Sequence, residues 1–136
     1  MNKIVLDTNA YTHLFKEKDS EVLVAVNCAE KIYFSSIVLG ELLYGFSAGT
    51  RLLHNRRRLT EFLSKETVEV TSITKDTAEI YGELKHILRV KGLPLPGNDV
   101  WIAASAIEYG AVLVTFDTHF LAIPGLRLWD RLKFKN

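Results

Sequence analysis

Apolar and β-branched residues gather in short runs along the chain, separated by polar or turn-forming residues. The run at residues 67–73 alternates in polarity and is rich in Val and Thr, which is typical of a strand. Pro124-Gly125 predicts a turn before the last run. Strands are therefore expected at residues 3–6, 31–34, 67–73, 111–115 and 126–129.

The longer stretches between these runs are interpreted as helices. Ser20 and the Ser35-Ser36 pair stand where helix N-caps belong. Thr74 starts the longest helix, whose apolar residues keep helical spacing up to the Gly92–Gly97 loop. Gly110 stands where a C-cap favours glycine. Helices are expected at residues 9–16, 20–29, 37–48, 51–65, from 74 to that loop, and at 100–109.

Strands and helices alternate throughout, a pattern that indicates an α/β fold with a mainly parallel central sheet flanked by helices. The crossovers are expected to be right-handed. The chain has 136 residues and no repeat, linker or low-complexity tract, so one domain is expected over residues 1–136. In such folds ligands bind beyond the carboxyl ends of the strands, and chemistry is expected at that edge.

Composition narrows the class of protein. The chain holds 17 Lys plus Arg against 16 Asp plus Glu, so any RNA partner requires local positive charge or metal ions that offset the acids. No apolar run reaches the roughly 18 to 20 residues of a membrane helix, and Asp7 interrupts what would be the apolar region of an export signal. Cys28 is the only cysteine, which excludes an internal disulfide and makes the cytoplasm the expected compartment.

Four acidic residues are predicted to meet at the carboxyl edge of the sheet. Asp7 ends the first strand, and Asp117 follows the strand at residues 111–115. Asp99 opens the helix that leads into this strand, and Glu41 lies about one turn into the helix after the second strand. Because parallel strands end at one edge, the topology brings these four carboxylates together.

Each Asp taken alone also fits a structural role. Asp99 fits a helix N-cap, Asp117 before Thr118 fits an Asx turn, and Asp7 fits a capping residue. One Asp can both cap a helix and bind a metal only if one carboxylate oxygen accepts the capping hydrogen bond and the other binds the ion. The convergence of four acids weighs against purely structural roles for all of them.

Glu41 is the acid that a structural role explains least well. Apolar residues occur on every face of its helix, which predicts burial on most sides. An ionised Glu in that setting is costly unless it is paired or bound to a cation, and no Arg or Lys lies within one turn. A structural partner from elsewhere stays open; without one, Glu41 belongs to a functional site.

Four carboxylates in one pocket repel one another, and a hard divalent cation such as Mg²⁺ or Mn²⁺ relieves that repulsion. Such a cluster suits phosphodiester hydrolysis, because a bound ion supplies hydroxide near neutral pH and stabilises the leaving oxygen. Zinc fits less well, since no Cys or His pair has ligand spacing. The histidines are interpreted as surface or hydrogen-bonded residues, although His119, two residues after Asp117, is within reach of the pocket.

Four motifs follow one another along the chain. They are Ile4-Val5-Leu6-Asp7-Thr8-Asn9, Ser36 with Gly40-Glu41-Leu42-Leu43-Tyr44-Gly45, Asn98-Asp99-Val100-Trp101-Ile102-Ala103-Ala104, and Val114-Thr115-Phe116-Asp117. In this order they resemble the motifs of the PIN-domain nucleases, and the chain length and Gly45 resemble the VapC-type toxins of prokaryotic toxin–antitoxin pairs. The resemblance covers the chain from about Ile4 to Trp129, and the ordered set is far more specific than any one motif.

The resemblance implies a three-layer α/β/α PIN-like fold and a Mg²⁺-dependent endoribonuclease that often forms homodimers. It also implies inhibition by a small antitoxin that folds over the toxin and reaches the site. Many relatives have a further acid where this chain has His119, which leaves a second metal ion open. The implied metal ligands and catalytic residues are Asp7, Glu41, Asp99 and Asp117, supported by Thr8, Asn9, Ser36 and Thr115.

Other functions remain open from the sequence. A haloacid-dehalogenase-type phosphatase needs a second Asp where this chain has Asn9, and a receiver-like phosphoacceptor needs an acidic pair where it has Leu6-Asp7. A catalytically inactive, RNA-binding PIN-like domain is expected to have lost an acid, and all four are present. A housekeeping RNA-processing nuclease would use the same residues as a toxin.

Two surfaces have competing interpretations. The basic cluster of Arg51, Arg56, Arg57 and Arg58 fits a solvated helix face, and it also fits contacts with the phosphates of an RNA backbone. The apolar stretch at residues 37–46 mostly fills the core, and the remainder is expected to form a groove for an amphipathic helix of the antitoxin. The aromatic residues expected to contribute are Tyr11, Phe15, Tyr44 and Phe46.

Overall fold

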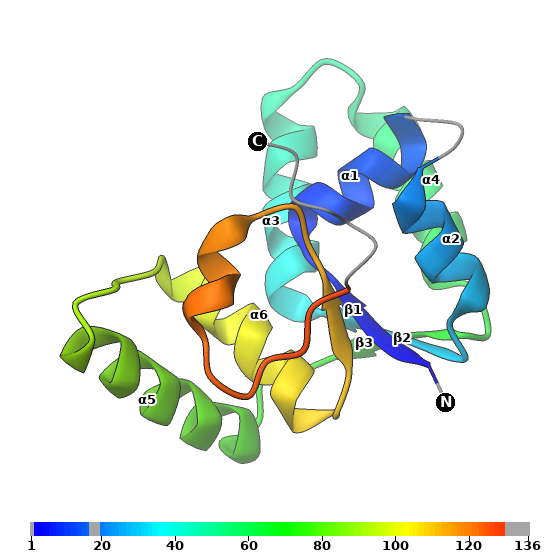
Figure 1. Cartoon of the computed structure of the whole chain (residues 1–136). Helices are drawn as coiled ribbons and strands as arrows, with labels where there is room; N and C mark the ends of the chain where they lie inside the picture. Colours follow the sequence, from blue (N-terminus) through cyan, green and yellow to red (C-terminus); the bar gives the residue numbers. More distant parts are fainter. Residues whose placement is uncertain (1, 17–19, 130–136) are drawn as a thin grey trace.

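A four-stranded parallel sheet forms the centre of the computed structural model, which describes residues 2–16 and 20–129 (Figure 1). The strand order is β3-β2-β1-β4. Residues 4–6 of β1 are fully buried, as expected for an inner strand with helices on both faces. The strands are β1 (Lys3–Leu6), β2 (Lys31–Ser35), β3 (Val68–Thr71) and β4 (Val112–Val114).

Helices cover both faces of this sheet. α1, α2 and α4 pack together on one side, whereas α6, covered in turn by α5, packs on the other (Figure 1). The expected three-layer α/β/α fold with a parallel sheet is confirmed. None of the described helices is long and apolar enough to cross a membrane. The helices are α1 (Thr8–Lys16), α2 (Glu21–Cys28), α3 (Ser36–Ala48), α4 (Leu52–Leu63), α5 (Lys75–Val90), α6 (Gly97–Glu108) and a 3-10 helix, η1 (Thr118–Ala122).

The predicted helix caps are present. The hydroxyls of Ser20 and Ser35 each accept a hydrogen bond, at 3.1 Å, from the backbone N–H two residues later, at the starts of α2 and α3. Thr74 forms a capping box with Thr77 at the start of α5. Gly110 adopts a φ of 62° just after α6, a left-handed conformation that favours glycine.

Two segments differ from the sequence-based expectation by more than two residues at an end. Residues 126–129 do not form a strand but pair with β4 at Leu113 alone, whose N–H donates to Arg127 O at 2.8 Å. β4 itself spans only three residues, so it offers little edge for a further strand. α6 begins at Gly97 rather than at residue 100, because Pro96 takes the N-cap position.

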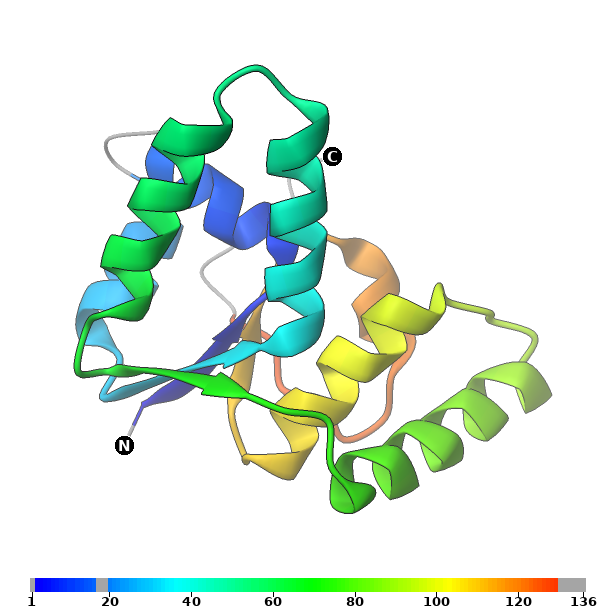
Figure 2. The same cartoon turned by 180° about the vertical axis from the view of Figure 1, so that it is seen from behind.

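The prediction that α3 is buried on most sides is wrong. Only Val38 and Leu42 of α3 are buried, and Tyr44 is 77% exposed. α3 runs outward from the carboxyl end of β2, past the edge of the sheet, so much of its surface has no layer to pack against (Figure 2). The apolar character of α3 therefore exceeds what the core of this chain requires.

Candidate active site

Asp7 lies at the junction of β1 and α1 and is only 5% exposed. Its Oδ1 accepts a hydrogen bond from the backbone N–H of Ala10 at 2.8 Å, which caps the first turn of α1. Its Oδ2 accepts the hydroxyl hydrogen of Thr115, which follows β4. A carboxylate offers about four acceptor directions, so Asp7 caps α1 and still has oxygen lone pairs for a ligand.

The environment of Asp7 makes ionisation difficult. The pKa of Asp7 is raised from 3.8 to about 6, chiefly by burial and to a smaller extent by the negative charges of Asp99 and Asp117. The hydrogen bonds from Thr115 and Ala10 oppose this shift only in part. A positive charge placed near Asp7 would therefore lower its pKa and favour the ionised form.

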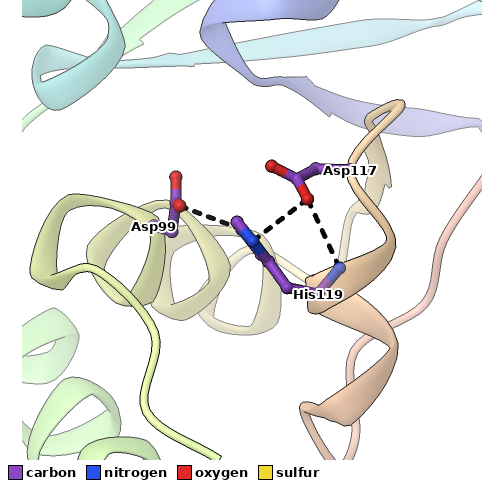
Figure 3. A group of neighbouring side chains, drawn as sticks. All are labelled: Asp99, Asp117 and His119. Atoms are coloured by element: carbon purple, nitrogen blue, oxygen red, sulfur yellow. Dashed lines mark hydrogen bonds and ion pairs between the residues drawn. The ribbon is translucent and has the colours of Figure 1, made fainter.

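Asp99 and Asp117 face each other across the same edge, one on α6 and the other at the start of η1 (Figure 3). The N-cap interpretation of Asp99 is wrong, because α6 starts two residues earlier and no side chain caps it. Asp117 does have the expected local role, since its Oδ1 accepts the N–H of His119 at 3.4 Å. Burial raises the pKa of Asp99, and the charges of Glu41 and Asp117 raise it further.

His119 lies between these two acids and reaches the pocket. Its Nδ1 is 3.0 Å from Asp117 Oδ1, and its Nε2 is 2.9 Å from Asp99 Oδ2 (Figure 3). The imidazole partly offsets the effects that raise the pKa of Asp99. Among the described residues, these three side chains are the group whose ligand atoms all lie within 4.8 Å of one another.

Glu41 joins the site through two polar contacts. Its Oε1 accepts the hydroxyl hydrogen of Thr8 at 2.6 Å, and its Oε2 accepts from the Asn98 amide at 2.5 Å. These contacts tie α3 to the starts of α1 and α6. Glu41 takes part in none of the ion pairs within the described ranges, yet its charge acts on Asp99. The four predicted acids thus lie at one edge, with Asp7 and Glu41 outside the tight group.

The other polar positions divide into two groups. Thr8 and Thr115 contact an acid directly, as described above. Ser36 instead donates to the backbone carbonyl of Thr71 at 2.5 Å and so ties α3 to β3. Asn9 is exposed, and its side chain has no hydrogen bond to another described residue.

The contact of the Asn98 amide with Glu41 was not expected from the sequence. Asn98 belongs to the Asn98-Asp99 pair, but the amide carried no expected role of its own. The available signal was its position beside an expected metal ligand at the start of a helix. Its contact with Glu41 spans 57 positions in the sequence, which local patterns do not reveal.

The basic cluster lies on α4 and its N-cap, and its members differ. The guanidinium of Arg58 lies over the ring of Phe15, 4.8 Å from its centroid, and one of its nitrogens is 2.9 Å from His54 Nε2. Arg58 therefore has partners within the protein. The other three members, Arg51, Arg56 and Arg57, are exposed.

Two cavities beside α1 form a groove that is lined by apolar and charged side chains. One cavity of about 390 Å³ lies between α1, α2 and α4, and a second of about 210 Å³ lies between α1, α3 and α4. Phe15 lines both cavities, and Tyr11 and Phe46 line the second. Tyr44 lines neither of them, so three of the four expected aromatic residues lie at this groove.

The donor set of the acidic edge fits a hard divalent ion. Carboxylate oxygens are the ligands that Mg²⁺ and Mn²⁺ prefer, and the acids here raise one another's pKa. No Lys or Arg forms an ion pair with these acids in the part of the chain that the structure describes. A cation at this edge would remove the repulsion that the described side chains leave uncompensated.

Comparison with known proteins gives a consistent result. Residues 4–126 match the model of the family described as PIN domain. The chain is 38% identical to Ribonuclease VapC2 of Rickettsia felis, over 93% of this chain and 98% of that protein. It is 32% identical to the tRNA(fMet)-specific endonuclease VapC of Salmonella typhimurium, over 96% and 98% of the two chains. The crystal structure of VapBC2 from Rickettsia felis bound to a promoter DNA fragment contains a similar chain, with TM-score 0.82, 35% identity and coverage of 93% and 97%.

Proposed function

Because this chain belongs to the PIN domain family and, within it, to the VapC ribonucleases, we propose that it is a toxin that hydrolyses RNA with a divalent metal ion. The observation that carries this proposal is the meeting of Asp7, Glu41, Asp99 and Asp117 at the carboxyl edge of the sheet. These four acids are the proposed ligands of Mg²⁺ or Mn²⁺. The bound ion supplies Lewis acidity, which activates water and stabilises charge on the phosphate.

The residues around the acids preorganise the site. Thr8 and Asn98 each hold one oxygen of Glu41, and Thr115 and the N–H of Ala10 each hold one oxygen of Asp7. Ligands fixed in this way do not have to be ordered when the ion binds. Without a cation, the same acids repel the phosphates of RNA, so substrate binding and metal binding are coupled.

RNA is proposed to bind through its backbone beyond the acidic edge. The net charge of +1 provides little long-range attraction, so local contacts carry the affinity. Arg51, Arg56 and Arg57 are the exposed candidates for phosphate contacts, whereas Arg58 is committed to Phe15 and His54. Such contacts position RNA without selecting its sequence.

A small antitoxin is proposed to silence the nuclease, and the protein is proposed to work in the cytoplasm, as a homodimer. An amphipathic helix of the antitoxin would occupy the groove beside Tyr11, Phe15 and Phe46. An Arg or Lys of the antitoxin would pair with the acids and displace the metal. The exposed apolar surface of α3, including Tyr44, is available for an interface between subunits.

Growth of the host tests this function. Expression of the chain alone should arrest bacterial growth, and co-expression of the neighbouring small protein should restore it. Glu41→Gln should abolish toxicity while the two proteins still copurify, because the groove is unchanged. Glu66→Gln, an exposed position just after α4, is the matched control and should stay toxic.

Two outcomes favour other functions. A chain that is folded, well expressed and active on RNA in vitro, but harmless to cells, is a housekeeping RNA-processing nuclease rather than a toxin. A chain that binds RNA but leaves it intact in Mg²⁺ and in Mn²⁺ is a catalytically inactive RNA-binding domain.

A further inference from the structure

His119 has no part in the proposed function so far, although it lies inside the site. Its Nδ1 and Nε2 face two different carboxylates, at 3.0 Å and 2.9 Å (Figure 3). The Nε2 atom is fully buried even though the ring is partly exposed. Its contact with Asp99 Oδ2 is an ion pair that lowers the pKa of Asp99.

Both ring nitrogens of His119 face a carboxylate oxygen. A carboxylate oxygen only accepts, so Asp117 Oδ1 favours a hydrogen on Nδ1 of His119. In the neutral ring, Nε2 then carries a lone pair and faces Asp99 Oδ2, which is also an acceptor. A proton on Nε2 or a cation beside both atoms makes this 2.9 Å contact favourable, so an ion can take the place of that proton.

The spacing of these two atoms suits adjacent ligands of one ion. Two ligands at right angles around an octahedral ion, each about 2.1 Å from it, are about 3 Å apart. His119 Nε2 and Asp99 Oδ2 already have this separation. Asp117 Oδ1 lies 3.0 Å from His119 Nδ1 and accepts the backbone N–H of His119, which leaves Oδ2 as the oxygen available to an ion.

We propose that His119 Nε2 is a ligand of the divalent ion, together with Asp99 and Asp117. This inference rests on the proposed function in one respect, the entry of a divalent ion at the acidic edge. Asp117 acts on the ring as a carboxylate acts on many metal-bound histidines, by accepting from the nitrogen that does not bind the ion. Mg²⁺ prefers oxygen donors, so a nitrogen ligand shifts the preference of the site from Mg²⁺ toward Mn²⁺.

Pulsed electron paramagnetic resonance tests this assignment directly. Mn²⁺ added to the purified full-length chain should give echo modulation from a directly bound nitrogen, and labelling the histidines with ¹⁵N should change its frequencies. His119→Asn should abolish the nitrogen modulation and weaken Mn²⁺ binding by about tenfold or more. His86→Asn, which changes an exposed histidine on α5, is the control and should leave the modulation intact.

A second variant separates ligand identity from folding. His119→Asp keeps an oxygen donor at this position, so Mn²⁺ should still bind, without nitrogen modulation. The ratio of Mn²⁺ to Mg²⁺ affinity should fall by about tenfold, as measured by calorimetry. Wild-type chain that cleaves RNA and binds Mn²⁺ without nitrogen modulation overturns the role of His119 alone. Wild-type chain that binds neither ion overturns the proposed metal-dependent function as well.

Discussion

The acidic edge has a closed half and an open half, and the two are built differently. Asp7, the closed half, sits in the core and takes one hydrogen bond on each oxygen. Asp99, Asp117 and His119, the open half, come from α6 and η1, remain partly exposed and mainly contact one another. The position of the Asp7 carboxylate is therefore fixed by hydrogen bonds before any ligand binds. The positions of the side chains in the open half depend on their contacts with one another and with any bound ion.

The two halves also differ in how they balance charge. Among the described residues no Lys, Arg or His forms an ion pair with Asp7, and burial is the main cause that raises its pKa to about 6. Asp99 has a raised pKa too, but His119 opposes the shift. In the closed half, the unfavourable burial of the Asp7 charge would be relieved by a bound ion. In the open half, His119 already offsets part of the unfavourable electrostatics of Asp99.

The largest expected effect comes from neutralising the closed half. Asp7→Asn should lower RNA cleavage by at least about 10²- to 10³-fold, because a fixed charge at the reacting centre is lost. Asn retains the cap of α1, so the fold should survive. Cleavage of RNA in Mg²⁺ measures the loss, and EDTA should stop the wild type until Mg²⁺ or Mn²⁺ is restored.

Asp76→Asn, at the exposed start of α5, is the matched control for this loss and should cleave normally. Full activity of Asp7→Asn, in a preparation free of contaminating nuclease, would contradict the assignment of Asp7 to the site.

The electrostatic penalty on Asp7 predicts how stability depends on pH without metal. Between about 4 and 6 the folded state binds more protons than the unfolded state, so stability falls as the pH rises through this window. A shift from 3.8 to about 6 corresponds to about 3 kcal/mol. Urea unfolding in EDTA should therefore show that the free energy of unfolding of wild type falls between about pH 4 and 6, and that this fall is absent in Asp7→Asn. Equal slopes for wild type and Asp7→Asn would show that Asp7 is not the group responsible.

For the open half, we expect metal binding to reverse the order in which wild type and Asp99→Asn melt. Without metal, Asp99→Asn removes the cost of burying a charge and the repulsion from Glu41 and Asp117. Because the pKa of Asp99 is raised overall, these effects outweigh the lost contact with His119, and the variant should melt no lower than wild type. At an ion concentration of about 100 times Kd, the ion stabilises wild type by about 2.7 kcal/mol, and wild type should then melt higher. Thermal melts with EDTA and with saturating Mg²⁺ measure both orders. If the ion shifts neither melting curve, the acidic edge is not a metal site.

The predictability of the two halves from sequence also differs. Asp7 follows a short apolar strand, and parallel topology alone places it at the functional edge. The N-cap interpretation of Asp99 failed because Pro96 starts α6 early, a shift at a helix end that propensity does not resolve. The contacts of Asn98 and His119 depend on how α6 and η1 pack, which no local pattern encodes.

The same lesson applies to α3. Its apolar sequence was interpreted as burial, but the helix projects past the sheet and exposes Tyr44. Hydrophobicity predicts that a surface is covered without saying whether the cover comes from this chain or from another one. The strand expected at residues 126–129 is absent for a related reason. Its pairing depends on the length of β4 rather than on its own residues.

Thr115 connects the two halves and offers the smallest and most specific test of the comparison. The Thr115 hydroxyl donates to Asp7 Oδ2, and its oxygen, Oγ1, accepts the backbone N–H of Asp117 at 3.0 Å. Thr115→Val removes both contacts at nearly constant volume, which should cost about 1 to 2 kcal/mol of stability. Because the hydrogen bond lowers the pKa of Asp7, its loss should raise that pKa and move the pH-dependent loss of stability to higher pH. Thr115→Ser keeps the hydroxyl and should restore the wild-type pH profile. A Thr115→Val protein that is less stable but keeps the wild-type profile would show that Thr115 only packs, and that the two halves are not coupled through it.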